Sequence, residues 1–232
     1  MKRILLKLSG EALAGEKKRG FDEATCEKVA LEVKALCDAG TEVAIVIGGG
    51  NFWRGRTSEK IDRTKADQIG MLATVMNCIY VSEIMRSVGL ETEIMTPFTV
   101  GAFTTLFSKD AAVAALSAGK IVFFAGGTGH PYFSTDTATV LRAIEIEADG
   151  ILLAKAIDGV YNADPAKDPS AVRYDSLSIN EVVDKQLGVI DLTASILCME
   201  NHMPMYVFAL AEEGGILHAA EGKDFNGTVI TA

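Results

Sequence analysis

"KRILLKLSGEALAG", residues 2 to 15, places one lysine inside a run of apolar residues. The apolar residues at 4 to 6 and at 8 predict a short strand buried on both faces, which is typical of a parallel sheet covered by helices. Lys7 interrupts this run. An ammonium group that is buried without a partner is strongly disfavoured, so Lys7 must reach water, a counter-charge or a ligand.

Helical and strand-like spacings of apolar residues alternate along the rest of the chain, which predicts an α/β fold. Asp22 is the predicted N-cap of the first helix, and Ser178 to Glu181 is a capping-box pattern. Residues 158–171 are rich in turn formers and predict a structured loop. The expected helices lie between Asp22 and Gly40, at 65–88, 109–118 and 136–147, from Ser178, and at 191–202; the expected strands lie at 42–47, 91–95, 120–125, 150–154, 203–210 and, at the sheet edge, 227–232.

The composition fits an ordinary globular protein of one domain, residues 1–232. Of the 232 residues, 49% are hydrophobic and 23% charged, and no linker, repeat or low-complexity tract divides them. The formal net charge of −9 argues against a nucleic-acid partner, because such binding depends on clustered Lys and Arg. A local positive pocket for a small phosphorylated ligand is compatible with this charge.

The cysteines and histidines show no pattern of a metal site. Four cysteines lie far apart without a CxxC pair, as expected of reduced thiols in a cytoplasmic protein. The histidines lack metal-ligand spacing, so no structural metal is expected. The apolar start is too short and has no cleavage site for a signal peptide, and no window approaches 18 uninterrupted apolar residues, so we expect no membrane partner.

Three expected strands end in glycine-rich turns: "KLSGEA" (7–12), "VIGGGN" (46–51) and "FAGGTGHPYFSTD" (124–136). Ligands of open parallel sheets bind beyond the carboxyl ends of the strands, and glycines let backbone N–H groups approach a phosphate. One such turn would be ordinary turn chemistry, whereas three at one edge favour an anion site. There is no GxxxxGK[ST], and "GGTGHP" does not fit GxGxxG, so neither common nucleotide motif is present. Lys7 and Arg54 could meet at this edge.

At these turns the sequence resembles the amino-acid kinase superfamily, and most closely its bacterial-type UMP kinases. The matching stretches span nearly the whole chain: "KLSGEAL" (7–13), "VIGGGNFWRG" (46–55), "DQIGMLATVMN" (67–77), "GTGHPYFSTDTA" (127–138), "DGVYNADPAKDP" (158–169) and "IDLTAS" (190–195). "GMLATVMN" and "STDTA" separate these kinases from relatives that act on carboxylates or carbamate.

This resemblance implies a three-layer αβα sandwich with a central, mostly parallel sheet, the amino-acid kinase fold. It implies transfer of the γ-phosphoryl group of ATP to UMP with Mg²⁺, giving UDP and ADP. It also implies a homo-oligomer, a hexamer, with nucleotide effectors such as GTP or UTP. A nucleoside monophosphate has a second pKa of about 6, by analogy with phosphoserine, so the acceptor oxygen is already an anion. Catalysis then needs positioning and charge stabilisation and no general base.

The resemblance assigns residues to three roles. The catalytic residues are Lys7, Arg54 and Asp191, with Asp191 orienting the cations. The ATP-binding residues are Lys7, Leu8, Ser9, Gly10, Gly50, Arg54, Lys155, Tyr161 and Asp164. The UMP-binding residues are Gly49, Asp67, Thr128, Gly129, His130, Pro131, Tyr132, Phe133, Ser134 and Thr135.

Each assignment has a structural alternative. Lys7 could be a strand-end lysine that extends to solvent, and Arg54 a loop charge in a surface pair. Asp67 could be a helix N-terminal acid, and Asp191 could cap the following helix, a role compatible with catalysis. The aromatic residues between 130 and 134 could belong to the core.

Two positions depart from the family pattern. His130 stands where Asn is common, and Lys155 with Ala156 stands where Thr or Asn often occurs. If His130 donates to uracil, CMP would be rejected; the alternative is that His130 shapes the loop while Thr128 or Thr135 reads the base. The segment "GEKKRG" (15–20) lies where the family has an effector-responsive loop, and its sequence decides nothing about regulation.

Three functions are therefore weighed. The first is a UMP kinase. The second is another kinase of the superfamily, acting on an acidic amino acid or a small phosphate, against which "DQIGMLAT" and "PYFSTD" argue. The third is a nucleotide-binding protein without turnover, against which the retained Lys7, Arg54 and Asp191 argue.

Overall fold

The computed structural model describes residues 1–53, 60–223 and 225–231, and within them nine strands form one sheet. The strands lie in the order β4-β3-β5-β2-β1-β6-β10-β11-β9. They are β1 (Arg3–Leu8), β2 (Glu42–Ile47), β3 (Thr92–Thr96), β4 (Thr105–Leu106), β5 (Ile121–Phe124), β6 (Gly150–Lys155), β9 (Ser176–Ser178), β10 (Met205–Ala209) and β11 (Thr228–Thr231). All neighbours run parallel except β10 and β11. The N-terminal strand is central, between β2 and β6.

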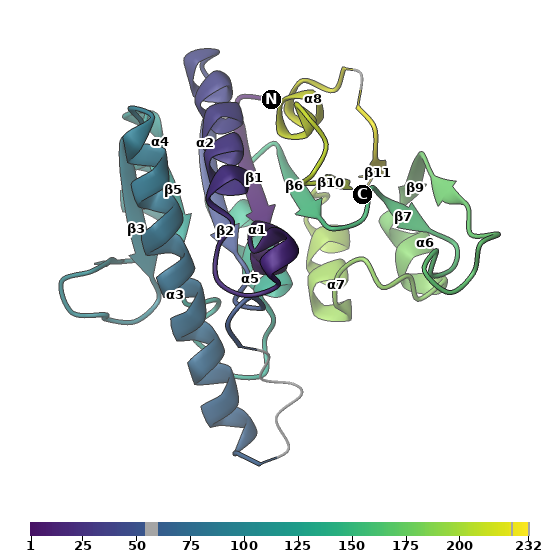
Figure 1. Ribbon diagram of the computed structural model, residues 1–232, viewed down its shortest axis with the longest axis horizontal. Coiled ribbons are helices and arrows are strands. Elements are labelled where there is room, and N and C mark those ends of the chain that lie inside the picture. Colours follow the sequence, from purple (N-terminus) through teal and green to yellow (C-terminus); the bar gives the residue numbers. More distant parts are fainter. Residues whose placement is uncertain (54–59, 224, 232) are drawn as a thin grey trace.

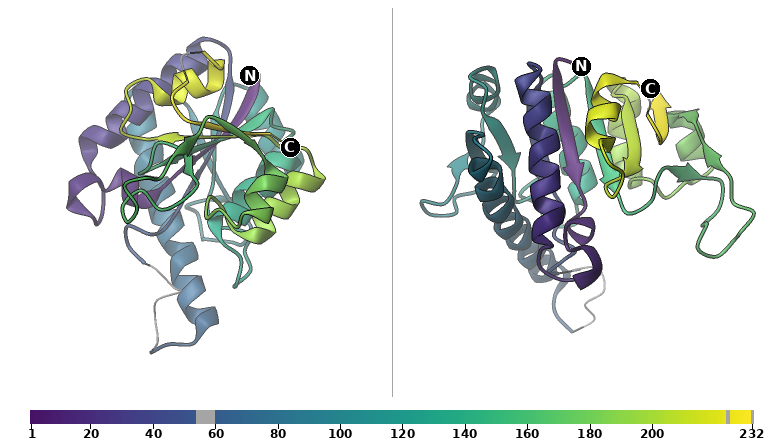
Figure 2. Two further views of the ribbon diagram at one scale, coloured as in Figure 1. Left: turned by 90° about the vertical axis from the view of Figure 1, so that its right-hand side faces the viewer. Right: turned by 45° about the horizontal axis from the view of Figure 1, so that its top comes forward.

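Helices cover both faces of this sheet, as Figure 1 and Figure 2 show. They are α1 (Gly10–Leu13), α2 (Glu23–Asp38), α3 (Arg63–Ser87), α4 (Lys109–Ser117), α5 (Thr135–Glu145), α6 (Ile179–Asp184), α7 (Leu192–Glu200) and α8 (Gly215–Glu221), with a 3₁₀ helix at Gly15–Lys17. Buried residues of α2, α3 and α8 share one core with the sheet, and those of α4 to α7 share the other. The predicted three-layer sandwich with a mostly parallel sheet is confirmed.

The alternation of side chains in β1 decides where Lys7 points. Ile4, Leu6 and Leu8 belong to the core beneath α2, α3 and α8, whereas Leu5 belongs to the core on the other face. Successive side chains of a strand point to opposite faces, so Lys7 shares the face of Leu5, on which α5 lies. The lysine is therefore aimed at a helix layer near the carboxyl end of a central strand.

The helix ends follow the local sequence. Asp22 accepts a hydrogen bond from the Thr25 N–H and caps α2, as predicted. Ser178 and Glu181 form the predicted capping box at the start of α6, with both reciprocal hydrogen bonds present.

One prediction about the C-terminal part needs correction, and two features of this part were not predicted. The strand at 228–231 is not at the edge, because β9 pairs with its outer side, Val229 opposite Ser176. The loop at 158–171 contains β7 (Val160–Tyr161), which pairs with β8 (Arg173–Tyr174) as a small antiparallel sheet. Helix α8 was not predicted, because it is short and its N-cap is a glycine, Gly214, in the left-handed conformation.

Helix α3 is long and apolar enough to cross a membrane by length and composition alone. Half of its most apolar 18-residue stretch is buried inside the structure, against the sheet and α2. A core helix passes the same test, so this finding is weak evidence for a membrane span.

Candidate active site

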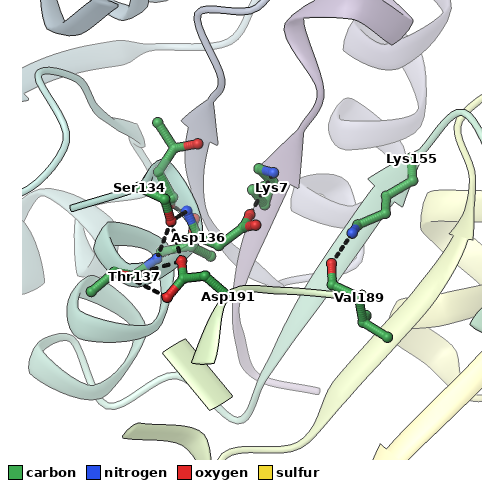
Figure 3. A network of polar contacts seen from close by, with 9 residues as sticks. Lys7, Ser134, Asp136, Thr137, Lys155, Val189 and Asp191 are labelled. Carbon is green, nitrogen blue, oxygen red and sulfur yellow. Dashed lines mark hydrogen bonds and ion pairs between the residues drawn. The ribbon is translucent and has the colours of Figure 1, made fainter. Parts of the chain in front are cut away.

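Lys7 is held by an ion pair with Asp136 (Figure 3). The Lys7 Nζ lies 2.6 Å from Asp136 Oδ1, and the two side chains are only 11% and 20% exposed. Asp136 belongs to the first turn of α5, where the positive end of the helix dipole favours a carboxylate. The lysine therefore lies at a helix N-terminus near the carboxyl end of β1. The sequence predicted Lys7 at this site but did not predict its partner.

Asp191 joins the N-termini of α5 and α7. Its carboxylate accepts a hydrogen bond from the Ala194 N–H at 3.0 Å, which caps α7. It also accepts hydrogen bonds from the Thr137 hydroxyl at 3.1 Å and from the Ser134 hydroxyl, which itself caps α5. The predicted capping role of Asp191 is confirmed. Among the described residues Lys7 pairs with Asp136 and not with Asp191, so the orienting role of Asp191 stays a prediction.

A small cavity of about 160 Å³ lies between the start of α3 and the loop before α5. Six predicted UMP-binding residues line it: Gly49, Asp67, Thr128, Phe133, Ser134 and Thr135. We call it the α3 cavity. Trp53, Arg63, Met71 and Thr74 also line it and were not predicted; their one sequence signal is their place in or beside the matching stretches. The α3 cavity thus collects most of one predicted ligand site.

Asp67 is the best-held charged group of the α3 cavity. Arg63 Nε donates to both of its carboxylate oxygens, at 3.0 and 2.9 Å. The Tyr132 N–H donates to Asp67 Oδ2 at 2.8 Å. The Arg63 guanidinium also lies 5.4 Å from the centre of the Tyr132 ring. These contacts fix the carboxylate and connect the N-terminal part of α3 to the loop at 127–134.

The remaining predicted UMP-binding residues lie in that loop outside the lining. Gly129, His130, Pro131 and Tyr132 do not line the α3 cavity, and His130 is exposed. The backbone N–H and carbonyl of His130 contact the Thr128 hydroxyl at 3.2 and 3.3 Å. Tyr132 has a φ of +72°, in the left-handed region, and its hydrogen bond to Asp67 supports this conformation.

A larger cavity of about 480 Å³ lies on the C-terminal side of the sheet. It is lined by the end of β6, the turn at 157–165 and the segment 185–189, and we call it the β6 cavity. Lys155, Tyr161 and Asp164, three predicted ATP-binding residues, all line it. These three residues therefore lie in a different cavity from the six predicted UMP-binding residues.

Lys155 is partly buried in the wall of the β6 cavity. Its Nζ donates a hydrogen bond to the Val189 carbonyl (Figure 3). Burial lowers the pKa of Lys155, the carboxylate of Asp136 opposes this, and the charge of Lys7 adds to it. The two lysines and Asp136 thus form one electrostatic group.

Tyr161 and Asp164 are held by the turn itself. The Tyr161 hydroxyl donates to Asp158 Oδ1 at 2.8 Å, and this contact raises the pKa of Tyr161. Asp164 accepts from the Ala166 N–H at 3.0 Å and pairs with Lys167 at 3.1 Å, and the lysine contact lowers the pKa of Asp164. Both residues thus have turn contacts as well as a place in the cavity wall.

Among the described residues, the other predicted ATP-binding residues line neither of these two cavities. The Leu8 side chain is fully buried in the core beneath α2. The Ser9 N–H donates to the Ala154 carbonyl at 3.3 Å, so this donor is used by the sheet. A Cβ on Gly10 would lie 2.3 Å from the Gly48 carbonyl oxygen, and one on Gly50 would lie 2.9 Å from a Glu11 oxygen, so both turns are tightly packed. Arg54 lies outside the described residues.

The chain is similar to known kinases over almost its full length. Residues 2–209 match the sequence model of the Amino acid kinase family. The UMP kinase from Bacillus anthracis matches with a TM-score of 0.94 and 39% identity, covering 99% of this chain and 96% of that one. The UMP kinase from Ureaplasma parvum gives 0.93 and 30%, covering 100% and 99%. The uridylate kinase from Archaeoglobus fulgidus gives 0.75 and 28%, covering 99% and 100%.

Proposed function

The chain belongs to the amino acid kinase family, and from this premise we propose that it transfers the γ-phosphoryl group of ATP to UMP, yielding UDP and ADP. One observation carries the proposal beyond the similarity itself. The Lys7–Asp136 pair lies between the two cavities. Asp136 directly follows Thr135, which lines the α3 cavity. Lys7 lies on β1, which pairs with β6, and Lys155 at the end of β6 lines the β6 cavity. A lysine in this position can contact a group that passes from one cavity to the other.

We assign UMP to the α3 cavity and ATP to the β6 cavity. The α3 cavity contains a fixed carboxylate, Asp67, that suits the ribose hydroxyls, and hydroxyl groups at Thr128, Ser134 and Thr135. The larger β6 cavity suits the larger nucleotide. One continuous sheet runs through both sides, which supports a single domain over residues 1–232.

The proposed phosphoryl transfer depends on the charged groups between the two cavities. The UMP phosphate oxygen is an anion at neutral pH, so no side chain has to remove a proton. The Lys7 ammonium stabilises the negative charge of the transferring phosphoryl group, and the N-terminus of α5 adds partial positive charge. Asp136 positions Lys7, and Asp191 fixes the ends of α5 and α7 against each other.

The residues present fit a Mg²⁺ ion that is carried by ATP. Among the described residues no three His, Cys, Asp or Glu side chains gather into a metal site. Mg²⁺ on nucleotides is commonly held by the phosphates and one or two carboxylates. Asp136 and Asp191 are two carboxylates at this edge that could do so (Figure 3). When bound, the ion would offset phosphate charge.

A coupled assay of ADP release tests the proposal. The acceptors are UMP, CMP, acetylglutamate and carbamate, each with ATP and Mg²⁺. We expect turnover with UMP far above the others. Preference for acetylglutamate or carbamate would identify a different kinase of the family, and nucleotide binding without ADP release would identify a binding protein.

We also propose that the chain forms a homo-oligomer through α3. Ile69, Leu72, Met76 and Ile79 recur every three or four residues along this helix and are 41 to 51% exposed. Such an apolar stripe is typical of a subunit contact. The resemblance specifies a hexamer. Light scattering of Leu72→Glu against the unmodified protein tests the contact, and ADP release with GTP or UTP tests the proposed effectors.

The cysteines support a cytoplasmic location. All four are unpaired in the structure, and burial raises the pKa of Cys26 and Cys37 to about 11. Such thiols stay protonated at neutral pH and react slowly. Unpaired cysteines are typical of proteins in a reducing compartment.

A further inference from the structure

Two buried amides lie directly behind the glycine-rich edge of the sheet. Asn51 and Asn77 are 1% and 0% exposed. Asn51 Nδ2 donates to Asn77 Oδ1 at 3.0 Å, and Asn77 Nδ2 donates to Asn51 Oδ1 at 2.8 Å. The two side chains thus form a reciprocal pair, which we call the amide pair.

The second N–H of each amide contacts a backbone carbonyl of a different loop. Asn77, from the middle of α3, donates to the Gly48 carbonyl at 2.7 Å. Asn51 donates to the Gly20 carbonyl at 2.8 Å, and the Gly20 N–H contacts the Asn51 carbonyl at 3.4 Å. A Cβ on Gly10 would lie 2.5 Å from Asn51 Oδ1, so the turn after β1 packs against the same pair. The turns after β1 and β2 and the loop at 15–20 therefore all contact the amide pair.

The contact with Gly48 has a directional consequence for the candidate site. The carbonyl and the following N–H of one planar peptide unit point in opposite directions. When Asn77 holds the Gly48 carbonyl, the Gly49 N–H is turned away from the amide pair. Gly49 lines the α3 cavity. The pair thus sets the direction of a backbone donor in the predicted UMP site.

We infer that Asn51 and Asn77 are positioning residues of phosphoryl transfer: they hold the loops after β1 and β2 in the register that aligns the two phosphates. This inference rests on the proposed kinase function. Neither side chain lines either cavity, so both act through the backbone of their partners. A purely structural pair would stabilise the fold and leave the catalytic step unchanged.

The same helix offers a matched control. Ser82 lies on α3, is 2% exposed, and its hydroxyl lies 2.8 Å from the Thr92 hydroxyl. It is a buried, hydrogen-bonded polar group whose partner is on β3 and not on a glycine-rich loop. Ser82→Ala therefore removes a buried hydrogen bond that does not involve any of the glycine-rich turns.

The experiment compares Asn77→Ala, Asn51→Ala and Ser82→Ala in the full chain, with kcat expressed per folded molecule from calorimetry. We expect Asn77→Ala to lower kcat by about 100-fold, the scale for slightly misplaced reactants, with KM for ATP changed less than about threefold. Asn51→Ala keeps the contact between Asn77 and Gly48 and should lose less. Ser82→Ala should keep kcat within about twofold despite a lower Tm.

The outcomes separate the two levels of the proposal. If the unmodified protein releases no ADP with UMP, the kinase function itself fails. If it is active and both asparagine variants keep kcat within about threefold, or lose no more than Ser82→Ala, the inference is overturned. If Asn77→Ala does not fold, Asn51→Ala decides by the same threshold. A loss that appears in Tm alone assigns the pair to stability.

Discussion

The two cavities are built in different ways. The α3 cavity is fixed by side chains: the carboxylate of Asp67 is 14% exposed, and Arg63 and the Tyr132 backbone hold both of its oxygens. The β6 cavity is formed mainly by turns, and its corresponding acid, Asp164, is 49% exposed and pairs with an exposed lysine. A rigid, side-chain-built site can discriminate between similar ligands, whereas a site made of turns adapts to its ligand. With UMP assigned to the α3 cavity as proposed, selectivity should therefore lie on the acceptor side.

Removing Lys7, the charged group that lies between the two cavities, should have the largest effect. Lys7→Ala removes the ammonium that we propose to face the transferring phosphoryl group, and Asp136 loses this partner. We expect kcat to fall by about 100-fold or more, the scale of one preorganised electrostatic donor. Steady-state ADP release measures kcat, and circular dichroism checks the fold. Turnover near that of the unmodified protein would contradict the assigned role.

Asp191→Asn should disturb the contact between the N-termini of α5 and α7 and should not change one cavity more than the other. An amide has one acceptor oxygen where the carboxylate accepts from Ser134, Thr137 and Ala194, so the ends of α5 and α7 lose alignment. We expect kcat to fall by about 10-fold or more and KM for UMP to change much less. The pH profile should lose no limb, because the proposed mechanism uses no general base. A change in UMP affinity alone would make it a pocket residue.

A matched pair of substitutions tests the two cavities separately. Asp67→Asn should raise KM for UMP by about 10-fold, the scale of a hydrogen bond to a charged group, and leave KM for ATP unchanged. Asp164→Asn should raise only KM for ATP, and by less, because this carboxylate is half exposed. Equal effects of both variants on both substrates would remove the distinction between the cavities.

A substitution at His130 tests which residue distinguishes uracil from cytosine. The sequence predicts that His130→Ala narrows the UMP over CMP ratio of kcat/KM by about 10-fold if the imidazole reads uracil. The structure favours the alternative, since His130 is exposed while Thr128 and Thr135 line the α3 cavity. We therefore expect the ratio to change by less than about twofold in His130→Ala. Assays with both substrates decide, and a 10-fold narrowing would return the role to His130.

Lys155 should give the smallest effect, in stability and not in selectivity. Its pKa is lowered in the folded protein from the ordinary 10.5, so the ammonium is less favourable folded than unfolded at neutral pH. This penalty shrinks as pH rises through the lowered pKa and vanishes above 10.5. Relative to Lys155→Met, the unmodified protein should thus gain about 2 to 4 °C in Tm between neutral and alkaline pH. A pH-independent difference in thermal unfolding would contradict the burial of a charged lysine.

The order of strands and helices could be predicted from the sequence because each element has its own apolar period and capping residues. Asp22 and the Ser178 capping box are local signals, and both were confirmed. β9 could not be predicted, because three residues carry no period and their pairing with β11 depends on a strand about fifty residues away. The reversal of β11 relative to β10 likewise has no local signal.

In the candidate site, too, single residues could be predicted from the sequence but their distant partners could not. Lys7 was evident as a charge inside an apolar strand, but its partner Asp136 lies 129 residues later. Asp136 was within a matching stretch, and its place in the first turn of a predicted helix was the one available signal. The amide pair joins Asn51 and Asn77, which the sequence shows only as polar residues at the ends of two motifs. Contacts between distant segments require the fold.

The central position of β1 also has a consequence for biosynthesis. The ribosome makes this strand first; β2 ends at Ile47, but β6, the other neighbour of β1, begins only at Gly150. At a synthesis rate of about 5 to 20 residues per second, one edge of β1 stays open for roughly 5 to 20 s. Open strand edges invite pairing with other nascent chains, and a lysine in such a strand disfavours it. We expect Lys7 to disfavour such pairing during synthesis, in addition to its proposed role in the folded site.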